Sequence, residues 1–595
     1  MAVLTLNNET FYKSLMAGAK EVIRRKDYLN EINVFPVADG DTGTNLASLM
    51  QTILMQSKLE DTIEKTLQGI IDAALLGARG NSGLIFASFL HGWLSQLTNK
   101  ESIELDDFIL SLEAAVPFAY EAIEKPVEGT MITLMKDLSI ALKQSNLNKS
   151  DVTESLEEAL KTLKISLDET KKAMKSLRNA DVVDAGAKGF VHFIEGFTLY
   201  MKTGVDEDFS IDEVPTEIEQ PHLDFGSEEH RYCTEALIKG DNLDAKKIKQ
   251  QLTTYGDSLV VAGSKNTLRL HIHTDTPQDV FYELRSFGSI LEQKVDDMKK
   301  QHDIVHNKKY SIALVTDSIA DLPKEYIDNK QINVIPVSLT IEDSNYYDKL
   351  TISSENFYRF MDELTTYPKS ATPNQKQVEN FYSFLATYYD HILVLSVSSK
   401  MSGTYNVFKQ ASKALDNHKT KIEIIDSRQN SGAEGLLVMK AQEYIEEGLT
   451  LQEIKRRIEF LRGKTRILVS VKTLKYMVRS GRLNKATGIV GKVINLKPVV
   501  SIDDTGEGII FDKAFSLQKA TKKIIEHVRE IDDLVGIERY AIVHANAIDR
   551  ANEYKDLFKE VLNKEPKYIM DISTVVAMNA GIGTVAIAYI EDVKF

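Results

Sequence analysis

The chain of 595 residues is too long for one hydrophobic core, so roughly three or four domains are expected. With 43% hydrophobic and 27% charged residues, its composition is that of an ordinary globular protein rather than a fibrous or disordered one. A net charge of -15 argues against a nucleic-acid-binding surface, and the single cysteine excludes an internal disulfide framework and indicates a reducing compartment.

The sequence also bears on location. The N-terminal residues lack the basic and apolar regions of a secretory signal, and no apolar run approaches the roughly 18 residues of a membrane span. We therefore expect a cytoplasmic protein without a transmembrane segment.

Two regions with different patterns make up the first part of the chain. Residues 1–203 are mainly helical in pattern, and from Ser155 apolar residues recur at spacings of three and four, as in amphipathic helices. Residues 204–229 contain two prolines and many acidic residues but no Lys or Arg, so we expect an acidic, solvated linker. The first region is therefore predicted to be an all-α domain.

The rest of the chain alternates strands and helices. Residues 230–305 predict a small α+β domain in which two strands form a hairpin with a turn near Ser264–Asn266. Over residues 306–595, β-rich runs alternate with helical segments, which predicts an α/β domain. We therefore expect a multidomain protein with all-α, α+β and α/β parts in that order.

The strongest motif is NVFPVADGDTGTNLASLM at residues 33–50. It places two aspartates on either side of a glycine and follows them with hydroxyl and amide side chains: Asp39, Asp41, Thr42, Thr44 and Asn45. Two such carboxylates can converge on Mg²⁺, which prefers oxygen ligands and keeps positions for waters and phosphate oxygens. The alternative is a turn followed by an N-capped helix, since Asp, Thr and Asn favour both places.

A glycine-rich turn, GARGNSG, follows at residues 77–83. Its backbone N–H groups and the Ser82 hydroxyl could hold phosphates at a helix start, where Gly80 and Gly83 would allow close approach. The turn matches neither a Walker loop nor a GxGxxG fingerprint, so a plain turn between two helices is the alternative.

Two short elements complete this set: EGTMIT with Thr130, and DVVDAGAKG with Asp184 and Gly186. Together with DGDTGTN and GARGNSG, they occur in the order found in the DhaL or DAK2 family, the nucleotide-binding subunits of dihydroxyacetone kinases. Residues 8–200 resemble still more closely the kinase domain of bacterial fatty acid kinases.

This resemblance implies a barrel of helices that binds ATP and Mg²⁺ at one end. Asp39 and Asp41 would be the Mg²⁺ ligands and the centre of catalysis. Contacts with the nucleotide would come from Thr42, Thr44, Asn45, Gly80, Ser82, Gly83, Thr130, Asp184 and Gly186. A third metal-binding aspartate of dihydroxyacetone kinases is replaced here by Asn33, as is usual in the fatty acid kinase branch.

The middle region carries three side chains that suit a metal. HIHTD places His271 and His273 two residues apart on a strand, so their side chains share a face. With Cys233 they would supply three ligands of a zinc-type site, and the alternative is ordinary histidines and a core cysteine. The region resembles the fatty acid kinase middle domain, with its YCTE and HxHT elements. This resemblance favours a bound Zn²⁺ and implies a homodimer. Whether the metal is structural or catalytic does not follow from the residues, and we expect a structural role.

From Tyr310 onwards, Ser, Thr and Gly gather at the ends of apolar strands, as in VTDSIADLP, PKSATPN, MSGTYN and VRSGRL. Such groups can meet an anion at the carboxyl edge of a sheet, although most of them simply make turns. Their order resembles the DegV family of fatty-acid-binding proteins over residues 310–595. The resemblance implies an apolar tunnel for a fatty acid, whose carboxylate would be bound by Ser370, Ser402, Thr404 and Arg482.

Two departures from the DegV pattern stand out. The TSQPS element is SATPN here, and the HTGPG element is NAGIG, which puts Asn579 where a histidine is usual. An asparagine can hydrogen-bond a carboxylate or phosphate, but it carries no imidazolium charge and shuttles no proton. The domain could therefore present a fatty acid itself, or it could dock a separate DegV-type protein that carries one.

We predict an ATP- and Mg²⁺-dependent, fatty acid kinase-like phosphotransferase that converts a fatty acid carboxylate into an acyl phosphate. One alternative is a kinase for dihydroxyacetone or another small ketose. Such a kinase usually needs a partner domain that holds the ketone, and the sequence suggests none. Another alternative is a lipid-binding or lipid-sensing protein whose kinase half is regulatory or silent.

Overall fold

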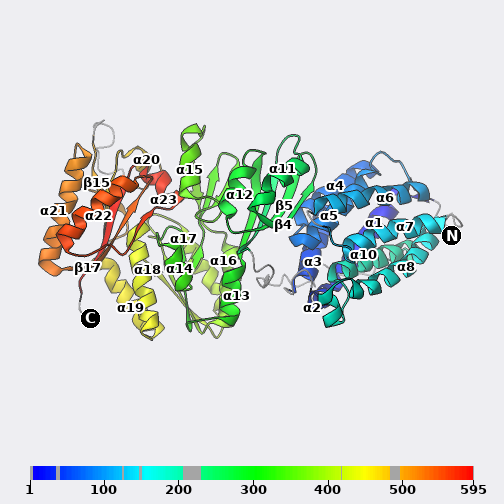
Figure 1. The fold of residues 1–595 in the computed structure, drawn as a ribbon, viewed down its shortest axis with the longest axis horizontal. Coiled ribbons are helices and arrows are strands. Elements are labelled where there is room, and N and C mark those ends of the chain that lie inside the picture. The colour runs from blue at the N-terminus through cyan, green and yellow to red at the C-terminus, as the bar shows by residue number, and fades with distance from the viewer. Residues whose placement is uncertain are drawn as a thin grey trace. The chain divides into compact units, whose positions relative to one another are not determined.

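A computed structural model describes residues 5–34, 40–123, 126–146, 151–205, 230–416, 418–480, 482 and 496–593 of the protein. Asp39 and residues 206–229 of the predicted linker lie outside these ranges. The described residues form two compact units, one ending at His302 and the other beginning at Asp303 (Figure 1). None of the helices in the described ranges is both long and apolar enough to cross a membrane.

The first part of the first unit is helical apart from one short strand pair, β1 (Thr5–Leu6) with β2 (Ile103–Glu104). Its helices are α1 (Asn8–Arg24), α2 (Lys26–Glu31), α3 (Thr42–Gln56), α4 (Ile63–Gly77), α5 (Gly80–Ser95), α6 (Leu105–Ala122), α7 (Met131–Asn146), α8 (Val152–Ala173), α9 (Lys175–Ala180) and α10 (Ala185–Thr203). Their apolar sides share one core, where the rings of Phe11, Trp93 and Phe108 meet edge to face. The prediction of an all-α domain is confirmed.

Local sequence explains where several of these helices begin and end. Asn7 and Asp151 accept hydrogen bonds from backbone N–H groups in the first turns of α1 and α8, which is the usual role of an N-cap. Helix α10 ends at Gly204, whose φ of 65° is a left-handed conformation that glycine adopts without strain.

The same unit continues with an antiparallel sheet in the order β4-β5-β3-β6. Its strands are β3 (Tyr232–Lys239), β4 (Gly256–Gly263), β5 (Thr267–Thr274) and β6 (Ser289–Asp297), and its helices are α11 (Ala245–Leu252) and α12 (Pro277–Leu284). Strands β4 and β5 form the predicted hairpin. Helix α13 (Met298–His306) follows β6.

This sheet packs directly on the helices. Val260 of β4 belongs to the same hydrophobic core as the helical residues and forms a β-bridge with Ile123, which follows α6. Arg269 of β5 is 3% exposed and donates hydrogen bonds to the carbonyl oxygens of Leu75 and Leu76 near the end of α4, at 3.4 and 2.7 Å. The helical and middle parts therefore share one core.

The second unit begins with a parallel sheet in the order β13-β12-β7-β8 and a small antiparallel sheet in the order β10-β9-β11. The strands are β7 (Ile312–Asp317), β8 (Asn333–Ile335), β9 (Ser338–Ile341), β10 (Ser344–Tyr347), β11 (Lys369–Ala371), β12 (His391–Ser396) and β13 (Lys421–Asp426). The helices among them are α14 (Lys324–Asn329), α15 (Ser354–Phe360), α16 (Gln375–Tyr388) and α17 (Thr404–Ala411).

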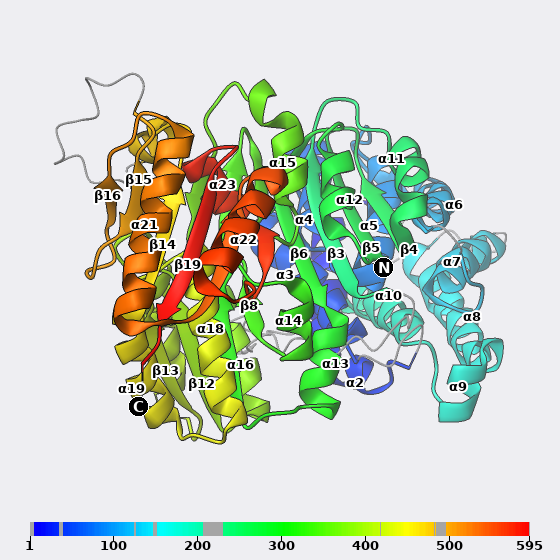
Figure 2. The ribbon, with the colours of Figure 1, turned by 60° about the vertical axis from the view of Figure 1, so that its left-hand side comes forward.

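A mixed sheet in the order β16-β15-β14-β19-β17-β18 completes this unit. Its strands are β14 (Thr465–Ser470), β15 (Val499–Ile502), β16 (Gly508–Asp512), β17 (Ile537–His544), β18 (Ile569–Asp571) and β19 (Val585–Glu591). The helices are α18 (Ser431–Glu446), α19 (Leu451–Leu461), α20 (Lys475–Arg479), α21 (Leu517–Val535), α22 (Ile548–Leu562) and α23 (Thr574–Ala580). Helices α21 and α22 cover one face of the sheet, and α18 packs on the other (Figure 2). The α/β prediction is confirmed.

Candidate functional site

The start of α3 brings together residues from both predicted phosphate-binding motifs. Asp41 precedes the helix, and the Asn45 side-chain amide donates a hydrogen bond to its Oδ2 at 2.7 Å. The Thr42 hydroxyl donates to Asn33 Oδ1 at 2.6 Å, and its oxygen lies 3.4 Å from the hydroxyl oxygen of Ser82 in the glycine-rich loop. Two segments about 40 residues apart thus place oxygen-rich side chains at one end of the helical part.

Asn33 has a clear physical role in this arrangement. It is buried, and its amide oxygen fixes the orientation of the Thr42 hydroxyl. Thr44 is held separately, because Asn30 accepts from its backbone N–H and donates to its hydroxyl, both at 3.0 Å. These contacts order the first turn of α3 without adding a negative charge.

The glycine-rich loop lies tightly against α3. Gly80 has a φ of 55°, and a Cβ there would overlap the side-chain amide of Asn45, so glycine is required for two reasons. Asn81 Oδ1 is buried and has no hydrogen-bond partner among the described residues. A buried polar atom of this kind usually meets a ligand or a water, so the loop suits a polar ligand such as a nucleotide.

Asp184, Gly186 and Thr130 lie at the starts of α10 and α7. Asp184 accepts a hydrogen bond from the Ala187 backbone N–H at 2.7 Å and one from the backbone of Met131, so it ties the two helix starts together. Burial raises the pKa of its carboxyl to about 6 in spite of these bonds. The Thr130 hydroxyl donates to the Val127 carbonyl at 2.8 Å. The local contacts of Asp184 are thus those of a structural cap.

The predicted zinc ligands meet on one face of the middle sheet. The strand register pairs Cys233 with His273 and Glu235 with His271. One ligand atom from each of Cys233, His271 and His273 lies within 4.8 Å of the others. His271 Nε2 is buried without a hydrogen-bond partner among the described residues. A thiolate and two imidazoles form a donor set that Zn²⁺ prefers, so these side chains fit that ion.

Two charged residues beside this cluster were not singled out by the sequence motifs. Glu235 is 2% exposed, and its Oε1 accepts a hydrogen bond from the backbone N–H of Gly80 at 2.9 Å. Its other carboxylate oxygen lies 3.9 Å from the Arg269 guanidinium. Burial opposes ionisation of Glu235, but the nearby His271 and the positive charges of Lys294 and Arg269 hold the pKa of its carboxyl below the ordinary value. Glu235 ends the YCTE element of the family resemblance, and strand alternation places it on the face of Cys233, but neither signal pointed to a contact with the glycine-rich loop.

The second unit contains a cavity of about 250 Å³ at the junction of its sheets. Apolar side chains form much of its wall, including Ile319, Val397, Ile467, Val500 and Val575. Four of the predicted lipid-binding residues line it: Ser370, Ser402, Arg482 and Asn579. The fifth, Thr404, does not line the cavity, but its hydroxyl oxygen lies 2.8 Å from that of the lining residue Ser402.

The polar side chains of the cavity are partly pre-ordered. Arg482 Nη2 donates a hydrogen bond to the Ser370 hydroxyl at 3.2 Å, and its Nη1 donates to the Ser480 carbonyl at 2.6 Å. Asn579 donates to the Val575 carbonyl at 2.6 Å, and its Oδ1 is buried without a partner among the described residues. The cavity thus combines apolar walls with a cation and hydroxyl groups, which suits an amphipathic anion.

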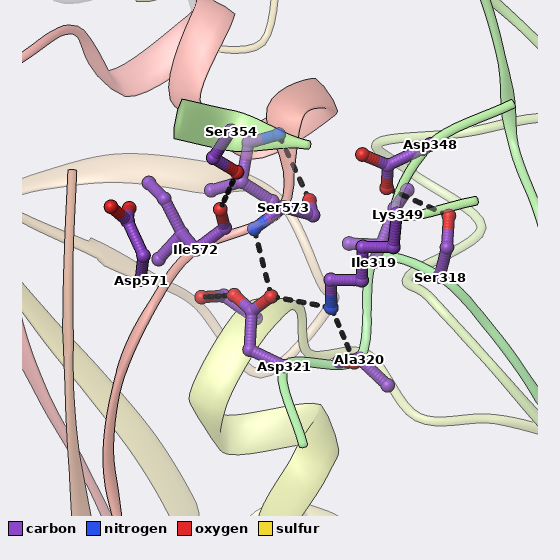
Figure 3. A network of polar contacts seen from close by, with 12 residues as sticks. Ser318, Ile319, Ala320, Asp321, Asp348, Lys349, Ser354, Asp571, Ile572 and Ser573 are labelled. Atoms are coloured by element: carbon purple, nitrogen blue, oxygen red, sulfur yellow. Dashed lines mark hydrogen bonds and ion pairs between the residues drawn. The ribbon is translucent and has the colours of Figure 1, made fainter. Parts of the chain in front are cut away.

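A buried polar network holds the helix that carries Asn579. Asp321 accepts hydrogen bonds from Lys349 at 2.7 Å and from the backbone N–H of Ser573 at 2.9 Å (Figure 3). Asp348 accepts one from the backbone N–H of Thr574 at 2.8 Å and one from the Ser318 hydroxyl, also at 2.8 Å. Two carboxylates thus face the start of α23, where the helix dipole favours negative charge.

Burial raises the pKa of Asp348 to about 6, although Lys349 and the hydrogen bonds favour its charged form. A carboxyl whose pKa is higher in the folded state binds its proton more tightly there. Proton binding by Asp348 therefore stabilises the folded state fully below the pKa of an aspartate in the unfolded chain, near 4. This contribution is lost as the pH rises through 6.

Helical, α+β and α/β parts follow one another in this order, so the chain is a multidomain protein. Three family models match it: the DAK2 domain over residues 36–199, the fatty acid kinase A-subunit-like middle domain over 229–305, and the DegV family over 311–592. The chain therefore contains a DAK2 domain, a middle domain of the fatty acid kinase type and a DegV domain.

Curated relatives match part of the chain. Protein YloV of Bacillus subtilis is 30% identical over 324 residues, which are 51% of this chain and 57% of that protein. An uncharacterised protein of Staphylococcus saprophyticus is 30% identical over 320 residues, which are 52% of this chain and 58% of that protein. The matches thus span little more than half the length of these relatives.

Solved structures resemble the protein over about half of its length. DegV of Bacillus subtilis, described as a fatty acid binding protein, is 25% identical, with a TM-score of 0.44 over 48% of this chain and 100% of that one. A fatty acid binding DegV family protein of Streptococcus agalactiae is 24% identical, with a TM-score of 0.45 over 48% of this chain and 100% of that one.

Proposed function

We propose that this chain is an ATP- and Mg²⁺-dependent, fatty acid kinase-like phosphotransferase. The observation that carries the proposal is that a DAK2 domain and a middle domain of the fatty acid kinase type share one chain with a cavity for an amphipathic anion. The substrate would be a fatty acid held in that cavity or carried by a separate DegV-type protein.

The residues at the start of α3 and α5 suit the binding of MgATP. Asp41, together with Asp39 just before the described segment, would hold Mg²⁺, which supplies charge neutralisation for phosphoryl transfer. The Ser82 hydroxyl could donate to a phosphate oxygen. The Thr42 hydroxyl, whose oxygen lies 3.4 Å from it, donates to Asn33 and would have to exchange that bond to donate to a phosphate. Asn45 orients Asp41 by its 2.7 Å hydrogen bond, so the carboxylate is held before the ligand arrives.

The reaction needs little from side chains beyond position and charge. A carboxylate oxygen of the fatty acid would attack the γ-phosphorus of ATP, forming the acyl phosphate bond as the bond to the β,γ-bridging oxygen breaks and ADP leaves. The attacking carboxylate is already ionised at pH 7, so no general base is required. In the cavity, Arg482 and the hydroxyl of Ser370 would bind and orient that carboxylate.

The proposal extends to Zn²⁺ at Cys233, His271 and His273, to a homodimer formed through the middle domain, and to a cytoplasmic location. We propose a structural role for this Zn²⁺, whose three protein ligands would come from two neighbouring strands of one sheet.

The test is ATP consumption by the purified chain with Mg²⁺ and a panel of fatty acids, with hydroxylamine to trap any acyl phosphate. A trapped product without added protein supports a self-contained fatty acid kinase. A product that appears only after addition of a separate DegV-type protein supports a docking role for the second unit. No product under either condition would refute fatty acid phosphorylation, and dihydroxyacetone would then be tested as the acceptor.

A further inference from the structure

Glu235 connects the Cys233/His271/His273 cluster to the glycine-rich loop. Its Oε1 accepts the Gly80 backbone N–H at 2.9 Å and lies 3.7 Å from His271 Nδ1. His271 Nδ1 in turn lies 3.9 Å from the sulfur of Cys233. The first N–H group of α5, which a helix leaves without an internal partner, is thus bonded by a carboxylate from the middle sheet.

The other side of Gly80 faces the proposed Mg²⁺ ligand. Gly80 packs against the Asn45 side-chain amide so closely that a Cβ there would overlap it. Asn45 donates its amide hydrogen bond to Asp41 Oδ2 at 2.7 Å. Contacts therefore run without a break from His271 through Glu235, Gly80 and Asn45 to Asp41.

The contact of Glu235 with Gly80 is held in place by its surroundings. Glu235 and Arg269 have side chains that are each 3% exposed, and their charged atoms lie 3.9 Å apart. Arg269 is anchored on the carbonyl oxygens of Leu75 and Leu76, just before the loop. A buried charge without its partner is strongly destabilising, so these residues hold the sheet and the loop in one arrangement.

We propose that Glu235 is a positioning residue that couples Zn²⁺ binding at Cys233, His271 and His273 to nucleotide binding at the starts of α3 and α5. This inference rests on the proposed function. A metal ion on His271 would fix the imidazole beside Glu235 and so hold the carboxylate against the Gly80 N–H. A loop that is already ordered loses less conformational entropy when it binds a nucleotide. By linkage, Zn²⁺ and MgATP then tighten each other's binding by the same factor.

The experiment is calorimetric titration of MgATP into the full chain, either saturated with Zn²⁺ or stripped by a zinc-selective chelator. For the wild type, we expect Zn²⁺ to tighten MgATP binding roughly fivefold or more, the range of ordinary allosteric coupling. Glu235→Ala should weaken MgATP binding and remove the effect of Zn²⁺ while still binding the ion. Glu235→Gln, whose amide oxygen can still accept from Gly80, should keep part of the effect.

Glu283→Gln is the matched control. Glu283 lies in the same unit and accepts hydrogen bonds from Gln251 and from the Tyr255 hydroxyl, the latter at 3.2 Å, but within the described structure it forms no hydrogen bond or ion pair with the glycine-rich loop, Arg269 or the three metal-binding side chains. This variant should keep the full effect of Zn²⁺. Amide hydrogen exchange of residues 77–84 gives a second readout: Zn²⁺ should slow it in the wild type and not in Glu235→Ala.

Several results would overturn the coupling. The first is that Zn²⁺ tightens MgATP binding to Glu235→Ala as much as to the wild type, although the variant binds the ion. The second is that Zn²⁺ does not change the MgATP affinity of the wild type, and the third is that the wild type binds no Zn²⁺. If Glu235→Ala does not fold, Glu235→Gln decides, because an effect as large as in the wild type would refute the role of the carboxylate. A wild type that binds no MgATP under any condition would instead refute the proposed function, and the coupling with it.

Discussion

Arg482 is the one cationic side chain among the residues that line the described cavity, and its replacement by methionine tests whether the cavity selects an acid. Arg482→Met removes the charge and the hydrogen bond to Ser370 but keeps a long, flexible side chain. A hydrogen bond from a charged group contributes about 1.5–3 kcal/mol, and about 1.4 kcal/mol corresponds to a tenfold change in affinity. We therefore expect the Kd of a long-chain fatty acid to rise roughly 10- to 100-fold.

Displacement of a fluorescent fatty acid at pH 8 measures this change, and the corresponding fatty alcohol serves as the matched ligand. The alcohol has the same tail but no charge, so its Kd should change little. Arg479→Met is the control variant, because Arg479 is exposed and stacks over the Tyr367 ring at 4.3 Å without lining the cavity. Equal losses for acid and alcohol in Arg482→Met would refute the assignment of Arg482 to the carboxylate.

Three further predictions concern other residues. Asp41→Asn, like Asp39→Asn, should abolish MgATP-dependent turnover with an unchanged melting temperature, and full activity in either variant would contradict the Mg²⁺ assignment. Asn579→His should raise the yield of acyl phosphate in the hydroxylamine assay if the cavity presents the substrate, whereas an unchanged yield would favour an external carrier. Asp348→Asn should reduce the loss of unfolding free energy between pH 4 and 7 by up to about 3 kcal/mol, since one pKa unit corresponds to about 1.4 kcal/mol. Denaturant titrations across that range measure it, and an identical pH profile in both proteins would argue against a raised pKa at Asp348.

The middle sheet shows what sequence patterns predict well. Side chains alternate between the faces of a strand, so HIHTD necessarily places His271 and His273 together. The hairpin turn was also predictable, because a short polar segment separates two apolar runs. The pairing of β3 with β5, which brings Cys233 opposite His273, depends on register and came only from the structure.

Contacts between distant segments were beyond prediction from the residues. Gly80 and Glu235 are 155 positions apart, and no local pattern links a helix start to a strand that far along the chain. Asp184 illustrates a different difficulty. An aspartate before a glycine-rich helix start suits both a nucleotide contact and an N-cap, and only the Ala187 hydrogen bond reveals the capping role.

The buried hydrogen bonds from Arg269 to the carbonyl oxygens at the end of α4 determine which fragments of the protein can be expected to fold alone. A cut at the family boundary near residue 229 would separate the helices from the middle sheet. The Arg269 guanidinium and the Glu235 carboxylate, whose side chains are each 3% exposed in the intact unit, would then meet water, and Val260 would lose its apolar neighbours on the helices. A fragment made by this cut should be poorly soluble alone, and the isolated helices should lose the donor for two carbonyl oxygens. Truncation near His302 leaves these contacts whole, so the smallest piece suited to nucleotide and metal titrations spans two family domains.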